Sequence, residues 1–237
     1  MKTGPLFLAA WLVALAGFVL MSILAASHDT FPADIWLAHR IQDVDIAAFD
    51  RALDWTEDAI RLRTVLPVCV ATAALILLAR DSRGALIVIT ATAGRPLTTW
   101  VAKELIERPR PPAELVDFQS QPSSFSFPSG HAESAILLYG LMFYFALVYI
   151  KNVWMRTGIQ AACVWIVVAG GIERVYAGHH WPSDVLGGYY LGALILSGTI
   201  VIHRLFIARR QIVTPTPSRS FSTATPATGH SAGRRET

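Results

Sequence analysis

Three short polar clusters interrupt an otherwise apolar sequence, and their residue types suit the binding and attack of a phosphate group. They occupy residues 103–111, 128–131 and 173–184. Lys and Arg supply fixed positive charge, and the planar fork of Arg matches phosphate oxygens in bidentate geometry. If the fold brings the three clusters together, they form an anion-binding site with imidazole groups beside it.

The predicted phosphate ligands come from all three clusters. They are Lys103, Arg110, Ser129, Gly130 and Arg174. Ser129 and Gly130 precede an apolar stretch and so lie at a predicted helix N-terminus, where backbone N–H groups and the helix dipole favour an anion. Taken singly, such features are typical of ordinary helix starts and of interfacial anchors. Their joint occurrence is what favours a site.

Two histidines and an aspartate are the predicted catalytic residues. His131 and His180 can exchange protons near neutral pH, and Asp184 follows His180 by four residues. If the turn there is helical, the carboxylate accepts the imidazole Nδ1–H and leaves Nε2 free to attack phosphorus. Further Cys or carboxylate groups at metal-ligand spacing are absent from the sequence, so we expect no zinc, no other metal and no cofactor.

The composition predicts that these clusters belong to a membrane protein. Of the 237 residues, 53% are hydrophobic and 16% are charged, and the mean hydropathy is +0.45. A soluble domain of this size carries roughly 25% charged residues, because it needs a polar surface. The formal charge of +3 is small and the basic residues are scattered, so we expect no nucleic-acid partner.

Six apolar stretches are candidates for membrane-spanning helices, which need about 20 residues each. They are residues 6–26, 64–79, 84–102, 132–150, 158–174 and 185–207. We expect the first to be retained, because it is too long for a signal-peptide core and lacks a clear cleavage site. The predicted fold is an all-α, six-helix transmembrane bundle within residues 1–210. Residues 211–237, rich in Thr, Ser, Pro and Ala, are predicted to form a disordered cytoplasmic tail.

An even number of spans places both termini on one side of the membrane, and the distribution of positive charge selects that side. Basic residues lie at or just beyond the ends of the second, fourth and sixth stretches: Arg80, Arg83, Lys151, Arg156, Arg204, Arg209 and Arg210. We therefore expect cytoplasmic termini in a cell membrane, with all three polar clusters on the exterior face.

Two further features of the sequence bear on this topology. Residues 29–58 are strongly acidic and fit an exterior loop, within which apolar residues at helical spacing predict one helix lying on the membrane surface. These apolar residues are Ile41, Val44, Ala48, Ala52 and Trp55. Arg95, beside Pro96, is a charge within the third stretch, so it must face protein or water.

The three clusters together resemble the signature of the type 2 phosphatidic acid phosphatases (PAP2), a superfamily of membrane lipid phosphatases that shares its core with vanadium haloperoxidases. The family pattern is Lys, six residues and Arg-Pro; then Pro-Ser-Gly-His; then Ser-Arg, five residues, His, three residues and Asp. Every spacing fits between Lys103 and Asp184. Glu173 stands where the family often has Ser, and the register to Asp184 selects His180 rather than His179.

The resemblance implies a metal-independent hydrolase of a lipid phosphomonoester or pyrophosphate, such as isoprenyl diphosphate, phosphatidic acid or phosphatidylglycerol phosphate. It implies that His180 attacks phosphorus to form a phosphohistidine, and that Asp184 orients the imidazole. His131 then protonates the leaving oxygen and activates the water that hydrolyses the intermediate. The five predicted ligands hold the equatorial oxygens of the phosphate, and the partner is a lipid phosphate within the membrane.

Two other functions fit parts of the pattern. A haloperoxidase would hold vanadate in the same cradle, but those relatives are soluble, and six spans argue against it. A catalytically silent lipid-binding membrane protein is expected to have lost catalytic residues, and this sequence retains each of them.

Overall fold

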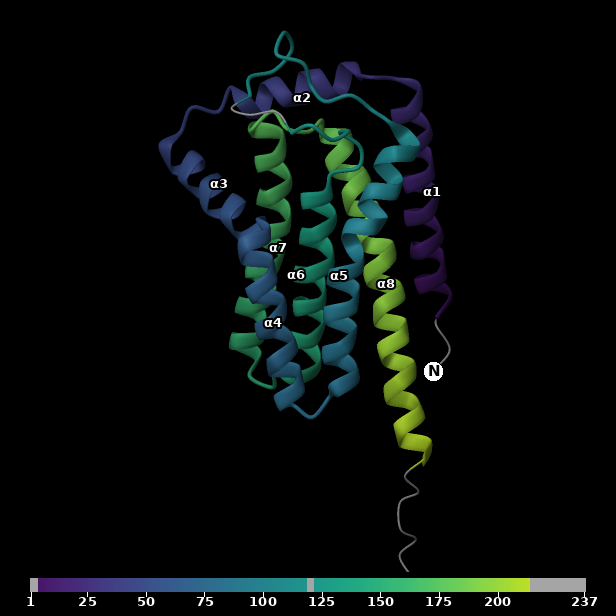
Figure 1. Ribbon diagram of the computed structural model, residues 1–237. Coiled ribbons are helices and arrows are strands. Elements are labelled where there is room, and N and C mark those ends of the chain that lie inside the picture. Colours follow the sequence, from purple (N-terminus) through teal and green to yellow (C-terminus); the bar gives the residue numbers. More distant parts are fainter. Residues whose placement is uncertain (1–3, 119–121, 214–237) are drawn as a thin grey trace, which may run out of the picture.

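The structure is a computed structural model that describes residues 4–118 and 122–213, all of whose regular elements are helices. Figure 1 shows an elongated bundle with one helix lying across its upper end. The helices are α1 (Pro5–Ser27), α2 (Pro32–Gln42), α3 (Ala47–Ile60), α4 (Leu62–Leu78), α5 (Ser82–Ile106), α6 (Gly130–Tyr149), α7 (Val153–Tyr176) and α8 (Pro182–Val213). The predicted all-α class is confirmed.

Among the described residues, five helices are long and apolar enough to cross a membrane, namely α1, α5, α6, α7 and α8. A sixth span is obtained when α3 and α4 are taken as one unit, which is bent by 61° at Arg61. The predicted bundle of six spans is thus found with one of them broken. The predicted stretch 64–79 corresponds to α4, which has 17 residues and meets the criteria only together with α3.

The observed helices extend beyond several predicted ends. α5 continues through Pro96 to Ile106, four residues past the predicted end at 102. α8 begins at Pro182 and runs to Val213, so the first three residues of the predicted tail are helical. The prediction of disorder was wrong for residues 211–213, which continue the helix α8. The rest of the predicted tail, residues 214–237, lies outside the described residues, and the domain boundary at 210 stays a prediction.

Helix α6 occupies the centre of the bundle and contacts α3, α4, α5, α7 and α8. Glycines on α8 let the backbones of α6 and α8 approach closely, as small residues do in membrane helix pairs. A Cβ added at Gly188 would lie 2.4 Å from the backbone oxygen of Ser129, and one at Gly192 would lie 2.9 Å from that of Glu133. This close contact places the start of α6 beside the start of α8.

The acidic region forms two helices instead of the single surface helix that was predicted. α2 lies across the upper end of the bundle, and α3 descends beside α7 (Figure 1). The predicted apolar face of this region is only partly covered by the protein: Ile41 packs against a buried cluster around Trp181, whereas Trp55 is 75% exposed. The buried residues of α3 are Leu53, Thr56 and Ile60. Ile60 lies over Gly170 of α7. The prediction of one helix was wrong because the chain leaves the helical conformation between Gln42 and Ala47.

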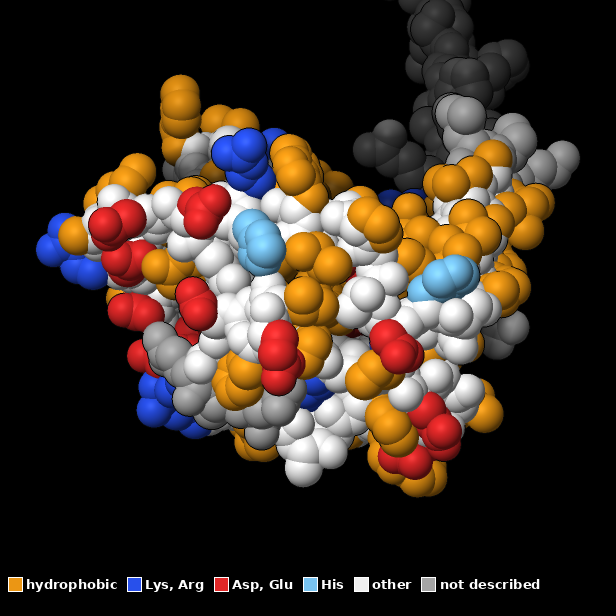
Figure 2. Space-filling model, turned by 90° about the horizontal axis from the view of Figure 1, so that it is seen from above, with side chains coloured by type: hydrophobic (Ala, Val, Ile, Leu, Met, Phe, Trp, Pro, Cys, Tyr) orange, Lys and Arg blue, Asp and Glu red, His pale blue; other side chains and the backbone are white. Residues whose placement is uncertain are grey.

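The upper end of the molecule carries much acidic charge. Figure 2, which views the molecule from this end, shows acidic side chains across most of the visible face. Exposed residues of the α2–α3 region contribute to this charge: Asp29, Asp43, Asp45, Asp54 and Asp58. The cationic groups of the three polar clusters lie mostly beneath this face, since Lys103, Arg108 and Arg174 are buried.

Candidate active site

A pocket of about 340 Å³ lies where the upper ends of α5, α6 and α7 meet the turn that leads into α8. It brings together six of the eight predicted site residues: Lys103, Arg110, Gly130, His131, Arg174 and His180. The lining also includes Arg95, His179 and the apolar residues Ile60, Leu62 and Val65. Asp184 and Ser129 are not among the residues that line the pocket, and both are fully buried behind it.

The turn between α7 and α8 holds His180 in place. The backbone N–H groups of His179 and His180 both donate to the carbonyl of Arg174, each at 3.2 Å. Gly178 makes the turn possible with a left-handed φ of +67°, and a Cβ there would lie 2.1 Å from the backbone oxygen of Asp117. In this position His180 is only 4% exposed.

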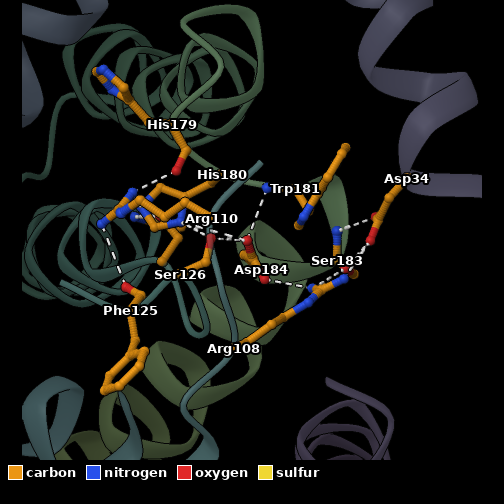
Figure 3. A network of polar contacts seen from close by, with 12 residues as sticks. Asp34, Arg108, Arg110, Phe125, Ser126, His179, His180, Trp181, Ser183 and Asp184 are labelled. Carbon is orange, nitrogen blue, oxygen red and sulfur yellow. Dashed lines mark hydrogen bonds and ion pairs between the residues drawn. The ribbon is translucent and has the colours of Figure 1, made fainter. Parts of the chain in front are cut away.

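The contact between His180 and Asp184 involves a third residue that the sequence analysis missed. The distance from His180 Nδ1 to Asp184 Oδ2 is 3.7 Å, longer than a hydrogen bond. Ser126 Oγ lies 3.4 Å from the same Nδ1 and donates to Asp184 Oδ2 at 2.5 Å. The backbone N–H of Trp181 also donates to Oδ2, at 2.8 Å. Ser126 therefore links the imidazole to the carboxylate (Figure 3).

The surroundings of His180 favour its neutral form. Burial is the largest influence and lowers the pKa of His180 to about 3, outweighing the opposing effect of Asp184. The imidazole is therefore neutral at physiological pH, as a nucleophile requires. Its Nε2 lies 3.5 Å from NH1 of Arg110, so the nitrogen opposite to Ser126 is directed at a cation of the pocket.

Arg110 is held so that its guanidinium stays beside this imidazole. Its Nε donates to the backbone oxygen of Ser124 at 2.8 Å, and its NH2 donates to the Ser124 hydroxyl at 3.1 Å. Its NH1 also donates to the backbone oxygen of His179. Burial lowers the pKa of the Arg110 guanidinium.

A buried ion-pair network lies behind the pocket and was also missed. Arg108 donates from NH1 to Asp184 Oδ1 at 2.6 Å and from NH2 to Asp34 Oδ2 at 2.9 Å. Asp34, from α2, also accepts from the Ser183 backbone N–H at 2.9 Å and from the Ser183 hydroxyl at 2.5 Å. Figure 3 shows Arg108 between the two carboxylates. Arg108 lies within the first polar cluster, whereas nothing in the sequence distinguished Asp34 from the other acidic residues around it.

Lys103 of α5 and Arg174 of α7 both line the pocket. The ammonium of Lys103 donates to the backbone oxygens of Phe125 and, at 3.5 Å, of Ser126. Arg174 pairs with Glu173 and, at 3.0 Å from NH2, with Glu57 of α3. Glu173, which replaces the usual Ser of the family pattern, thus contacts Arg174 directly.

The N-terminus of α6 opens into the pocket at Gly130 and His131. Ser129 is the N-cap, and its hydroxyl accepts from the backbone N–H of Ala132 at 3.5 Å. The backbone N–H of Ser129 donates to the backbone oxygen of Asp184 at 2.9 Å, which joins α6 to α8. Direct binding of phosphate by Ser129 therefore stays a prediction, since its groups have partners within the protein.

No group of three or more His, Cys, Asp or Glu side chains that could hold a metal ion occurs within residues 4–118 and 122–213.

The sequence profile of the PAP2 superfamily matches residues 84–208 of this chain. Phosphatidylglycerophosphatase B of Bacillus subtilis is 42% identical over 107 residues, which cover 42% of this chain and 48% of that protein. An undecaprenyl-diphosphatase of Sulfolobus acidocaldarius is 35% identical over 81 residues, or 32% of this chain and 33% of that protein. The matches thus span about half, or less, of each of these two relatives.

The fold is also similar to a crystal structure of a transmembrane PAP2 type phosphatidylglycerolphosphate phosphatase from Bacillus subtilis. The TM-score is 0.68 at 27% sequence identity, and the likeness covers 83% of this chain and 96% of that one. This likeness and the apolar helices identify a multi-pass membrane protein.

Proposed function

Because this chain belongs to the PAP2 superfamily, we propose that it is a membrane phosphatase that releases phosphate from a lipid phosphomonoester or pyrophosphate. The observation that carries the proposal is the single pocket in which His131 and His180 lie together with the three cations Lys103, Arg110 and Arg174. Lipid phosphates are substrates with the matching charge. The names of the relatives, which include a phosphatidylglycerophosphatase and an undecaprenyl-diphosphatase, support this class of substrate.

In the proposed reaction, the three cations and the N-terminus of α6 hold the oxygens of the phosphoryl group. These donors are fixed before the substrate arrives, so they stabilise charge in the transition state without reorganisation; one such donor is worth roughly 3–4 kcal/mol in related enzymes. Lys103 and Arg174 are themselves buried, so their interactions with the phosphoryl group are weakened less by water than those of exposed cations.

His180 then attacks through Nε2 and forms a bond to phosphorus, while the bond from phosphorus to the leaving oxygen breaks. Ser126 and Asp184 hold the Nδ1 side and stabilise the positive charge that develops on the imidazole. His131 donates a proton to the leaving oxygen. In the second step, His131 accepts a proton from water, which attacks the phosphohistidine and releases inorganic phosphate.

The membrane orientation follows from the charge distribution. The α4–α5 and α6–α7 connections, which carry Arg80 and Lys151, lie with Arg83 at the start of α5 at the end of the bundle opposite to α2 (Figure 1). Under the positive-inside rule that end is cytoplasmic. The active site is then exterior, and both termini are cytoplasmic.

The proposal is tested by phosphate release from a panel of lipid phosphates with purified full-length protein in detergent, in the presence of EDTA. We expect release to continue with EDTA, and to be abolished in both His180→Ala and His131→Ala while expression is unchanged. His28→Ala removes an exposed histidine at the same end of the molecule and is the matched control. Retained turnover in either catalytic variant contradicts the assigned roles, and no release from any lipid phosphate contradicts the proposed function.

A further inference from the structure

Arg95 has no role in the reaction described above, although it is a charged residue within a membrane-spanning helix. It lies in α5 and lines the same pocket as His131 and His180. An ionisable residue within the membrane is costly, and such residues normally face a polar cavity and serve a function. Its position in the pocket raises the question of which ligand it contacts.

The guanidinium of Arg95 has few partners within the protein. In the described part of the chain it makes one hydrogen bond, from NH1 to the backbone oxygen of Gly130 at 2.9 Å. Its other N–H donors are therefore available to a ligand. The nearby carboxylate of Glu133 does not take them up, because it accepts hydrogen bonds from the hydroxyls of Thr98 and Thr99. Arg95 thus presents positive charge to the pocket.

The location of Arg95 places it beside the proposed proton donor to the leaving group. The residue that it contacts, Gly130, directly precedes His131, the proposed proton donor to the leaving oxygen. Lys103 lies eight residues further along α5, about 12 Å along the helix axis at 1.5 Å per residue. The two side chains therefore leave α5 at different levels and reach different backbone partners, Gly130 for Arg95 and Phe125 for Lys103.

We propose that Arg95 determines specificity by binding a second anionic group on the leaving-group side of the scissile phosphate. The preferred substrates are then lipids that carry another phosphate between the scissile phosphate and the tail. This inference rests on the proposed phosphatase function and narrows its substrate class. The apolar residues Ile60, Leu62 and Val65, which line the same pocket, can contact the lipid beyond that second phosphate.

The chemistry of three lipid phosphates shows what Arg95 would distinguish. When Nε2 of His180 displaces the terminal phosphate of an isoprenyl diphosphate, the bond from phosphorus to the bridging oxygen breaks. The electron pair stays on that oxygen, and the leaving group is an anionic lipid monophosphate. With phosphatidylglycerol phosphate, the leaving group is an alcohol that carries a phosphodiester. With phosphatidic acid, the leaving group is a neutral diacylglycerol, which offers Arg95 no anion.

The test compares substrates that share a tail, in detergent, with the full-length protein. Farnesyl diphosphate is paired with farnesyl monophosphate, and dioleoyl phosphatidylglycerol phosphate is paired with dioleoyl phosphatidic acid. We expect Arg95→Gln to lower kcat/KM for the two-phosphate member of each pair about tenfold more than for its partner. Arg95→Lys, which keeps the charge, retains part of the preference.

A matched control is Arg83→Gln, which removes an exposed arginine at the other end of the same helix and leaves both ratios unchanged. Equal losses for both members of each pair, or unchanged ratios in Arg95→Gln, overturn the inference while the phosphatase function stands. No release from any substrate by the wild type overturns the function itself. If Arg95→Gln does not fold, inhibition of the wild-type protein by inorganic anions replaces it. Inorganic pyrophosphate should inhibit at least tenfold more strongly than inorganic phosphate, and equal inhibition by the two anions overturns the inference.

Discussion

The residues that orient His180 are joined to one another through a single carboxylate. Asp184 accepts hydrogen bonds from Ser126, from the Trp181 backbone and from Arg108. Its Oδ2 lies 3.7 Å from Nδ1 of His180. A carboxylate with this many donors is rotationally fixed. The position of the proposed nucleophile is thus determined by groups that do not line the pocket.

Ser126 gives a prediction at this scale. We expect Ser126→Ala to lower kcat by roughly 10- to 100-fold with little change in KM, because removing one buried partner costs about 1–3 kcal/mol and affects the nucleophile rather than substrate binding. Steady-state kinetics on one lipid phosphate measure both constants. Ser123→Ala, an exposed serine of the same loop, is the control. A raised KM at unchanged kcat would place Ser126 in substrate binding instead.

The titration of His180 gives a second prediction. Its pKa is lowered to about 3 by burial, whereas a histidine in an unfolded chain titrates near 6.5. As the pH falls below about 6.5, the unfolded state takes up a proton that the folded state does not. This group therefore lowers the free energy of unfolding as the solution becomes more acidic, and has no such effect above about pH 6.5. We expect NMR signals of His180, assigned by comparison with His180→Ala, to show no titration between pH 5 and 8. A midpoint near 6.5 contradicts a buried, neutral nucleophile.

Motif spacing was sufficient to predict residues that share one pocket, because six of the eight predicted site residues line it. Spacing could not predict Asp34 or Ser126. Their importance depends on which buried groups they contact across 74 and 58 positions of sequence. Such contacts are set by helix packing rather than by local pattern. Arg108 was visible as a charge in the first cluster, but its direction away from the pocket was not.

At the scale of elements, hydrophobicity predicted where helices cross the membrane better than where they end or which face they bury. The stretch at 64–79 is too short on its own, and the structure reveals that it continues from α3 across a 61° bend. In α3 the buried face includes Thr56, which lies over Gly170 of α7. The absence of a side chain on the neighbouring helix decides this packing, and no periodicity within α3 records it.

Helix α2 matters to the active site because its Asp34 neutralises Arg108 from the side opposite to Asp184. We expect Asp34→Ala to lower the thermal midpoint and to reduce kcat. Removing one partner of a buried ion pair costs about 3–5 kcal/mol, and the freed Arg108 can then reorient away from Asp184. Thermal unfolding in detergent and steady-state kinetics measure the two effects.

The matched control is Asp43→Ala, at the exposed C-terminal end of the same helix, which we expect to change neither quantity. An Asp34→Ala protein with wild-type stability and turnover would show that α2 covers the bundle without supporting the site.

At the scale of the whole molecule, the distribution of charge relates the fold to the membrane. Acidic side chains gather over the end that carries α2, whereas the basic connections lie at the opposite end. We expect a reporter enzyme fused after Arg210 to be active only in the cytoplasm, and one inserted after Asp45, between α2 and α3, to be active only outside. An exterior signal from the first fusion contradicts the proposed orientation.

The covalent intermediate is the most direct test of the proposed chemistry. Purified full-length protein is mixed with a lipid phosphate labelled in the scissile phosphoryl group and quenched in alkali, where phosphohistidine survives. The label should be found on the peptide that contains His180 and should be absent in His180→Ala. In His131→Ala, with a substrate that has an activated leaving group, the labelled intermediate should accumulate, because Asp184 and His180 are intact and only its hydrolysis is slowed. Label retained by His180→Ala, or phosphate released without any labelled histidine, would contradict the mechanism.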